Sequence, residues 1–377
     1  MSIKTITSEM LMTWFVQLSL QRLHRLRAVG LLLCIMLVAA GCGLPANPTI
    51  IKIGLVAPFE GAYRDVGYDA IYAARLAVRE INTYNAPLGW AIELVAYDDR
   101  AEQEMAITSA RNLVVDPEVV AVIGHYLPET TFAASDIYAS ADLSMLVIGD
   151  GPQAPGIWHL APDPQEYSDR LLDTIGSSIE NTAVWGEGAM AFEIRQQLSQ
   201  RASIIVDSDS TTVSILPDTI FSTLSPLQTA EYLDIWSQAG WKGQLVGTSS
   251  LHTTSFEAVS GQAVTGVCYI TPYPLPGDVA NISSWVEAYT STDPHAPAPG
   301  PYALATYEAV YILAKTISDN LEPHSSLTRQ EFNAALANTR RTSHLGEIFW
   351  NAQGYWNAAP LYHYCWQQKP VLMGILN

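Results

Sequence analysis

The chain has 377 residues, too many for one ordinary domain, and about half of them are apolar while only 15% are charged. This composition favours a globular α/β protein with a large core, divided into two lobes. The first 41 residues carry a net charge of +3 within a total of −18, so the remainder carries −21. Nucleic acid and anionic lipid would repel such an acidic body, which excludes nucleic acid as an expected partner.

The N-terminal 42 residues have the pattern of an export signal. An apolar run at 29–41 follows a cluster of three arginines and is too short for a standard membrane span. The segment AAGC at 39–42 resembles a bacterial lipobox, whose cysteine is lipidated after cleavage. The resemblance implies a signal peptide over 1–42, lipidation at Cys42, and an extracytoplasmic body that its lipid anchors to the cell membrane. The alternative is an uncleaved membrane anchor, which also places the body outside the cytoplasm.

Strand and helix patterns alternate along the rest of the chain. Short apolar runs predict buried strands, and apolar residues at helical spacing predict amphipathic helices. This alternation predicts an α/β protein built from doubly wound parallel sheets. In chain order we expect strand 51–57, helix 68–83, strand 91–97, helix 102–115, strand 119–123, helix 130–141, strand 144–148, helix 164–179, strand 182–185, helix 189–200, strands 202–206 and 218–222, helix 227–239, strands 243–247 and 264–271, helices 281–290, 301–320 and 328–339, and strands 347–350 and 361–367.

The second half of this pattern lacks one helix. A parallel crossover usually needs a dozen or more residues and a helix, but little sequence separates strand 202–206 from strand 218–222. We therefore expect a shortened second lobe, in which this connection crosses without a helix or the two strands pair differently.

The stretch 51–82 carries a family resemblance. A strand leads into Pro58 and Gly61, and Gly67 precedes a helix that ends in EIN. These features resemble the start of the type I periplasmic binding proteins, specifically the leucine/isoleucine/valine-binding family of ABC importers. Three later segments resemble the same family in the same order, namely VAYDDRAE at 95–102, IGHYLPETTFAASDIY at 123–138 and GPYALATYEAVYILAKTI at 300–317.

The resemblance implies two doubly wound lobes joined by three crossovers. Lobe 1 would hold 43–160 and 273–354, and lobe 2 would hold 161–272 and 355–377. A small-molecule ligand would bind in the cleft between them, and the closed lobes of a monomer would present a joint face to ABC permease subunits. The sequence contains no G-x-S-x-G, H-E-x-x-H or P-loop motif, so we expect neither a cofactor nor enzyme activity.

The resemblance also places the ligand site. In relatives that bind branched-chain amino acids, backbone amides and a serine hold the ligand carboxylate, and an acid in the second lobe pairs with its ammonium group. Here Pro128 stands at the serine and has no N–H, and 248–250, TSS, replaces the acid. The resemblance therefore predicts the ligand-binding cleft but does not predict specificity for amino acids.

We expect instead a small polar metabolite, neutral or cationic, with stacking from aromatic side chains. The predicted walls contain one base, Arg64, and five acids, which are Glu60, Asp65, Glu129, Asp150 and Glu187. The predicted ligand-binding residues are Tyr63, Val66, Tyr126, Leu127, Glu129, Thr130, Gly149, Asp150, Gly151, Gln153, Trp185, Ser225, Ser249 and Tyr273.

A second motif competes with this interpretation. The segment GEGAMA at 186–191 follows a strand, opens a helix and fits the dinucleotide-binding fingerprint G-x-G-x-x-A, with Asp207 placed as its ribose acid. Glu187 lies where a phosphate would approach, and the chain carries an export signal, so we expect no nicotinamide or flavin cofactor. The segment also resembles the family's aromatic-G-E-G cleft wall, which puts Trp185 at a ligand-stacking position.

No other motif indicates catalysis or metal binding. The eight histidines are scattered, and His125 is expected to be a buried, hydrogen-bonded residue. No Cys/His spacing predicts a zinc site. Cys268 and Cys365 form a disulfide or remain two buried free thiols.

Two classes of function stay open. The first is a solute-binding lipoprotein that feeds an ABC importer of the branched-chain amino acid type. The alternative is a ligand sensor or interaction protein that retains the fold without transport. A third interpretation, an exported NAD-binding oxidoreductase, rests on the GEGAMA segment alone.

Overall fold

The computed structural model describes residues 48–175, 181–201, 204–206, 217–321 and 327–376. Within this range, the residues from Thr49 onward belong to one compact unit. The predicted signal peptide, with Cys42, lies outside the described residues. Among the helices that are described, none has both the length and the apolar character needed to cross a membrane.

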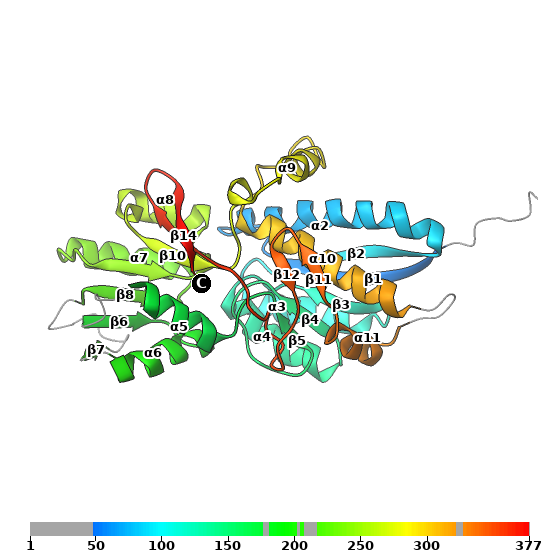
Figure 1. Ribbon diagram of the computed structural model, residues 1–377, viewed down its shortest axis with the longest axis horizontal. Helices are drawn as coiled ribbons and strands as arrows, with labels where there is room; N and C mark the ends of the chain where they lie inside the picture. The colour runs from blue at the N-terminus through cyan, green and yellow to red at the C-terminus, as the bar shows by residue number, and fades with distance from the viewer. Residues whose placement is uncertain (1–47, 176–180, 202–203, 207–216, 322–326, 377) are drawn as a thin grey trace, which may run out of the picture. The chain divides into compact units, whose positions relative to one another are not determined.

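The first sheet is parallel throughout and has the strand order β2-β1-β3-β4-β5. Helices connect its strands, and α2 lies beside β1 and β2 in Figure 1. Its strands are almost wholly apolar because helices cover both faces. The elements are β1 (Thr49–Ala57), α2 (Arg64–Asn85), β2 (Trp90–Asp98), α3 (Gln103–Val115), β3 (Val119–Ile123), α4 (Pro128–Ser140), β4 (Ser144–Val147) and β5 (Ile157–His159).

The second sheet has the order β14-β13-β10-β9-β8-β6-β7. Strands β6 to β10 pair in parallel, while β13 is antiparallel to β10 and β14 is antiparallel to β13. Its elements are α5 (Pro164–Ile175), β6 (Asn181–Trp185), α6 (Ala189–Arg201), β7 (Ile204–Val206), β8 (Thr219–Ser222), α7 (Pro226–Gln238), β9 (Gln244–Gly247), α8 (Thr254–Ser260), β10 (Cys268–Thr271), β13 (Leu361–Trp366) and β14 (Pro370–Leu376).

The segment between β10 and β13 returns to the first sheet. Its helices share one apolar core with β1 and β3, and α10 packs along α2. Asp69 of α2 accepts hydrogen bonds from the backbone N–H groups of Gly300 and Tyr302, so a carboxylate caps the positive end of α10. These elements are α9 (Ser283–Thr290), α10 (Pro301–Asn320), α11 (Arg329–Leu336), β11 (Arg341–Ser343) and β12 (Gly346–Ile348).

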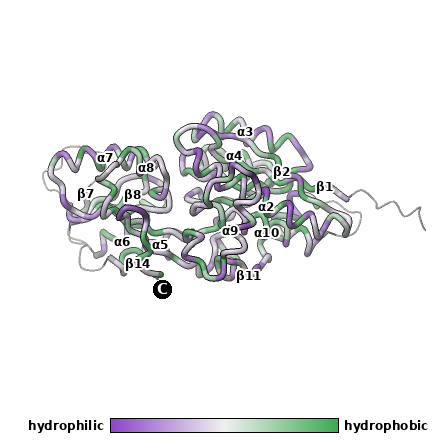
Figure 2. Tube along the Cα trace, turned by 90° about the horizontal axis from the view of Figure 1, so that it is seen from above, coloured by the Kyte–Doolittle hydropathy of each residue, from purple (hydrophilic) through white to green (hydrophobic). Residues whose placement is uncertain are grey.

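The structure confirms the predicted α/β class and most of the predicted elements. Hydrophilic and hydrophobic residues alternate along α3 and α7, the amphipathic pattern on which the helix predictions rest (Figure 2). Four short elements were missed, namely β5, α8, β11 and β14. The two strands that flank the shortened connection both pair with β6 and not with each other, while residues 207–216 between them lie outside the described range.

The glycine that precedes the first helix is required by close packing. A Cβ atom on Gly67 would lie 2.1 Å from the carbonyl oxygen of Pro58, a backbone atom that cannot move aside. Gly61, between them, has a φ of 85°. The spacing of these residues therefore lets α2 begin directly against the end of β1.

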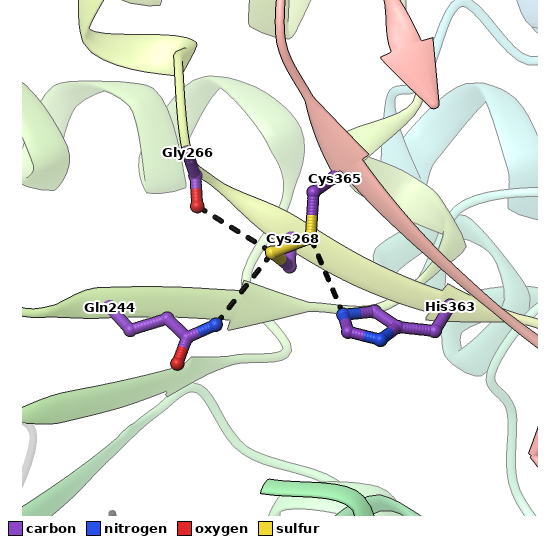
Figure 3. Close-up of a disulfide and its surroundings, with 5 residues drawn as sticks. All are labelled: Gln244, Gly266, Cys268, His363 and Cys365. Carbon is purple, nitrogen blue, oxygen red and sulfur yellow. Dashed lines mark hydrogen bonds between the residues drawn. A yellow bond between two sulfur atoms is a disulfide. The ribbon is translucent and has the colours of Figure 1, made fainter. Parts of the chain in front are cut away.

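Of the two states open for the cysteines, the structure has the disulfide. Cys268 of β10 and Cys365 of β13 lie opposite each other in the antiparallel pair, and their Sγ atoms are bonded (Figure 3). Gln244 donates a hydrogen bond to Cys268 Sγ, and His363 Nε2 lies 3.4 Å from Cys365 Sγ. Among the described residues, these two cysteines and His363 form the one group whose possible metal-ligand atoms lie close together. The disulfide already uses both sulfur atoms of this group.

Candidate functional site

A cavity of about 500 Å³ lies between side chains carried by the first and the second sheet. The first sheet contributes the N-terminal turn of α4. The second contributes the loop after β6 and the β8–α7 connection. The lining residues are Pro128, Glu129, Phe132, Trp185, Gly186, Glu187, Gly188, Thr223, Leu224, Gln228 and Tyr232. Each of these segments follows the carboxyl end of a parallel strand, where ligands of open α/β sheets bind.

Two loop glycines let the second-sheet wall form. Gly186 and Gly188 have φ values of 106° and 94°, and a Cβ on Gly186 would lie 2.3 Å from the Thr223 hydroxyl oxygen. The Arg195 guanidinium donates to the carbonyl oxygen of Gly186 at 2.6 Å and fixes the loop through its backbone. Glu187 is exposed at the cavity. Asp207, the acid of the competing dinucleotide motif, lies outside the described residues.

Aromatic rings form the floor of this cavity. Trp185 is 4% exposed, and its ring lies 5.3 Å from that of Tyr232 and 5.6 Å from that of Trp236, measured between centroids. Phe132, which is 40% exposed, contributes a ring from α4. The cavity therefore offers flat apolar surface next to the carboxylates of Glu129 and Glu187.

A narrower cavity of about 50 Å³ adjoins the first and shares Pro128 and Thr223 with it. Its other lining residues include Tyr126, Gly149, Asp150, His159, Tyr167, Ser249, Tyr273, Tyr302 and Tyr355. The Tyr273 hydroxyl is buried and forms no hydrogen bond within the described part of the chain.

The acid and the histidine of the narrow cavity have shifted pKa values. Burial raises the pKa of Asp150 to about 6, although the Gly151 N–H donates to its carboxylate. Burial lowers the pKa of His159 to about 4, which keeps its imidazole neutral at pH 7. The His159 ring stacks on Tyr355 and its Nε2 lies 3.2 Å from the carbonyl oxygen of Pro152.

The structure brings seven of the fourteen predicted ligand-binding residues to these two cavities. Glu129 and Trp185 line the wider one, and Tyr126, Gly149, Asp150, Ser249 and Tyr273 line the narrower one. The other seven are placed elsewhere among the described residues. Leu127 and Thr130 are buried, Gly151 packs on Thr131, Gln153 is exposed, and Ser225 caps α7. Tyr63 accepts a long hydrogen bond from Leu227 N–H, and Val66 lines a third cavity.

That third cavity, of about 610 Å³, also receives two charged residues of the predicted walls. Arg64 and Asp65 line it, and neither lines the two cavities described above. Glu60 forms a salt bridge with Arg100 at 3.2 Å. The predicted excess of acid around the ligand is therefore carried by Glu129, Asp150 and Glu187.

Sequence reasoning missed Phe132, Thr223 and Tyr232 as cavity residues. Phe132 and Tyr232 lie one helical turn beyond Glu129 and Gln228, so a search along the same helix faces would have found them. Thr223 carries no such signal, because its place depends on contact with Gly186 in a different loop.

His125 is buried and hydrogen-bonded, as predicted. Its Nδ1 lies 2.6 Å from Asp99 Oδ2 and its Nε2 lies 3.3 Å from the Tyr138 hydroxyl. Both members of the His125–Asp99 pair have fully buried side chains. The pair joins the ends of β2 and β3 and supports the segment that leads to Pro128 and Glu129.

Sequence comparison identifies relatives of the whole body. A family model described as "Periplasmic binding protein" matches residues 50–185. The leucine-specific-binding protein of Salmonella typhimurium is 26% identical over 303 residues, which span 71% of this chain and 79% of that protein. A leucine-, isoleucine-, valine-, threonine- and alanine-binding protein of Pseudomonas aeruginosa is 24% identical over 331 residues, covering 79% of this chain and 84% of the relative.

Solved structures show the same fold. A leucine-binding protein from Thermotoga maritima superposes with a TM-score of 0.71 at 18% identity, covering 87% of this chain and 99% of the other. A solute-binding protein from R. palustris in complex with benzoate superposes with a TM-score of 0.66 at 18% identity, covering 86% and 96%. With the ordered strand–helix pattern and a cavity walled from two sheets, these likenesses show the fold of a type I periplasmic binding protein and a sequence similarity to the leucine- and leucine/isoleucine/valine-binding proteins.

Proposed function

We propose that this protein captures a small polar solute in the cleft between two lobes and delivers it to an ABC importer of the branched-chain amino acid type. The single observation that supports this most is the cavity of about 500 Å³, whose walls come from α4 on one side and from the loops after β6 and β8 on the other. A ligand there would touch both lobes, and binding energy would favour their closure. The lobes are those predicted from the sequence, 43–160 with 273–354 and 161–272 with 355–377.

Two hydrogen bonds between the predicted lobes support an arrangement in which the lobes meet. The Thr254 N–H donates to Asp65 Oδ2 at 2.7 Å, and the Tyr302 hydroxyl donates to the carbonyl oxygen of Ser249 at 3.3 Å. Hydrogen bonds of this kind stabilise a closed state by only ~1 kcal/mol each. A ligand that bridges the lobes can therefore shift the balance between open and closed forms.

Solute binding is expected to raise the thermal stability of the protein. A ligand at one hundred times its dissociation constant adds ~2.7 kcal/mol to the free energy of unfolding. The test is a thermal-shift screen of amino acids, amides, amines, aromatic acids and sugars, repeated on the Phe132→Ala variant.

The control for this screen is Phe192→Ala. Phe192 is 63% exposed and does not line the cavity, so its removal should leave the ligand response unchanged, while Phe132→Ala should weaken it. No stabilisation by any compound, or stabilisation that Phe132→Ala leaves intact, would count against solute capture in this cleft.

We propose in addition that the body is extracytoplasmic and anchored to the cell membrane through a lipid on Cys42. The support is the apolar run that follows an arginine cluster and ends in AAGC. Intact mass measurement of the protein from membranes should show an N-terminus at Cys42 carrying acyl chains. Serine at this position should release the body from the membrane fraction or leave the precursor uncleaved. Recovery of an unmodified N-terminus upstream of Cys42 would refute the proposal.

A further inference from the structure

We propose that the solute held by this cleft is a small organic cation with an apolar body, and not a zwitterionic or anionic compound. The inference rests on the proposed function and names the chemical class that the cleft selects. It follows from the charge of the walls, the hydrogen-bond partners of the wall carboxylates, and the rings beside them.

Acids are the only charged groups among the residues that line the two adjoining cavities. Glu129 and Glu187 line the wider cavity and Asp150 the narrower, and the residues that line them include no lysine or arginine. Asp150 of the narrower cavity lies close to the wall of the wider one, because a Cβ on Gly188 would be 3.5 Å from Asp150 Oδ2. His159 is the remaining titratable base, and it is neutral at pH 7. The Arg195 guanidinium, which contacts the loop after β6, donates to the carbonyl oxygens of Val184 and Gly186.

The three cavity carboxylates, of which Glu129 and Asp150 are partly buried and Glu187 is exposed, lack the cationic partners that a buried acid elsewhere in the chain has. Glu308 is fully buried and is paired with both Arg341 and His344. In the described part of the chain, Glu129, Asp150 and Glu187 form no salt bridge, and the protein donor to Asp150 is the adjacent Gly151 N–H. Burial of a carboxylate without a cation is costly, and the raised pKa of Asp150 reflects that cost. A ligand cation would supply the missing partner.

Three helix N-termini oppose this charge but do not cancel it. The first turns of α4 and α7 and the residue before α6 line the wider cavity, and each N-terminus carries a partial charge of roughly +0.5. Together they offset about one and a half of the three carboxylates, and Pro128 contributes no N–H to bind an anion. Glu129 itself lies in the first turn of α4 and already complements its dipole.

The aromatic wall favours the same ligand class. Trp185, Tyr232 and Phe132 present ring faces or edges beside Glu129 and Glu187. A cation within about 6 Å of a ring centroid gains ~0.5–2 kcal/mol from the ring quadrupole, most strongly with tryptophan. An aliphatic carboxylate gains nothing from these rings and meets three like charges.

Two matched pairs of probes test this inference by calorimetry on the full chain. Benzamidine and benzoate share a planar aromatic body but carry opposite charge, and leucinamide differs from leucine by the loss of its carboxylate. We expect the cation of each pair to bind at least tenfold more tightly than its counterpart. Glu129→Gln and Asp150→Asn should each weaken cation binding by more than tenfold. The control Glu231→Gln alters an exposed acid of α7 that does not line either cavity and should change nothing.

The pH dependence provides a second readout. Benzamidine keeps its charge between pH 5 and pH 7, whereas Asp150 loses its proton across this range, so affinity should rise with pH in the wild type. Asp150→Asn should flatten that rise, which a merely structural role would not do. Glu129 and Glu187 are the other carboxylates that face the ligand.

Each outcome decides the inference. Tighter binding of benzoate or leucine overturns the cation assignment but leaves solute capture intact. If none of the four probes binds, the compound that stabilises the protein most in the thermal-shift screen is used instead. A cationic compound supports the inference, and an anion or a zwitterion overturns it. Failure of every compound in the screen removes both the proposed function and this inference.

Discussion

Replacement of His125 by alanine is expected to lower the free energy of unfolding by about 3–5 kcal/mol. The imidazole lies 2.6 Å from Asp99 Oδ2, and both side chains are fully buried. Without His125, the Asp99 carboxylate would stay in the interior with its remaining donor, the Ala101 N–H, and the Tyr138 hydroxyl would lose its partner as well. Urea denaturation of the two proteins measures the difference.

A double-mutant cycle separates the pair from the cavity left by the ring. The variant with both Asp99→Ala and His125→Ala should be less destabilised than the sum of the single variants, because no unpaired carboxylate remains. His295→Ala is the matched control, since this histidine is exposed and its loss should change stability by less than about 0.5 kcal/mol. A loss below 1 kcal/mol for His125→Ala would show that the pair does not stabilise the fold.

The His125 variant should also weaken ligand binding. The segment from His125 to Glu129 connects β3 to the cavity wall, and its start is fixed by the pair. A wall residue that can shift by about 1 Å loses much of its contribution to binding. We therefore expect the ligand found in the thermal-shift screen to bind less tightly to this variant under conditions where it remains folded.

Loss of the disulfide is the second large effect that we expect. Changing both Cys268 and Cys365 to serine should lower the free energy of unfolding by about 2–5 kcal/mol. The two cysteines are 97 residues apart, and closing a loop of this length in the unfolded chain removes much of its conformational freedom. The bond also ties β13 to β10 at the place where the chain enters the second sheet for the last time.

Guanidinium denaturation with and without a dithiol reductant measures this effect. The reductant should shift the unfolding midpoint of the wild type toward that of the serine variant, and it should leave the variant unchanged. Equal midpoints for oxidised wild type and serine variant would contradict a stabilising bond. Using the double substitution avoids a free thiol, which would form mixed disulfides and obscure the comparison.

The fold class and the longer elements could be predicted from the residue pattern alone. The apolar run at 51–57 and the helical spacing at 301–320 correspond to β1 and to α10, whose first residue is Pro301. These elements are long enough for their period to appear in the residue pattern. The three-residue strands β5 and β11 are too short for a period, and they form because β4 and β12 provide partners.

The same limit applied to the cysteines. Their sequence context left a disulfide and two free thiols equally open, because neither spacing nor composition determines which strands pair. The antiparallel register of β10 and β13 puts Cys268 opposite Cys365, and that register is a long-range property.

For the site, the family resemblance pointed to the segments that contain Glu129, Asp150 and Trp185. Long-range packing, which the residue pattern does not reveal, places Arg64 at a different cavity, Tyr63 beside Leu227, and Thr223 against Gly186. A cleft is formed by side chains far apart in sequence, and their directions depend on helix rotation and strand register. Local patterns determine elements, but the charge that a ligand meets is determined by how those elements pack.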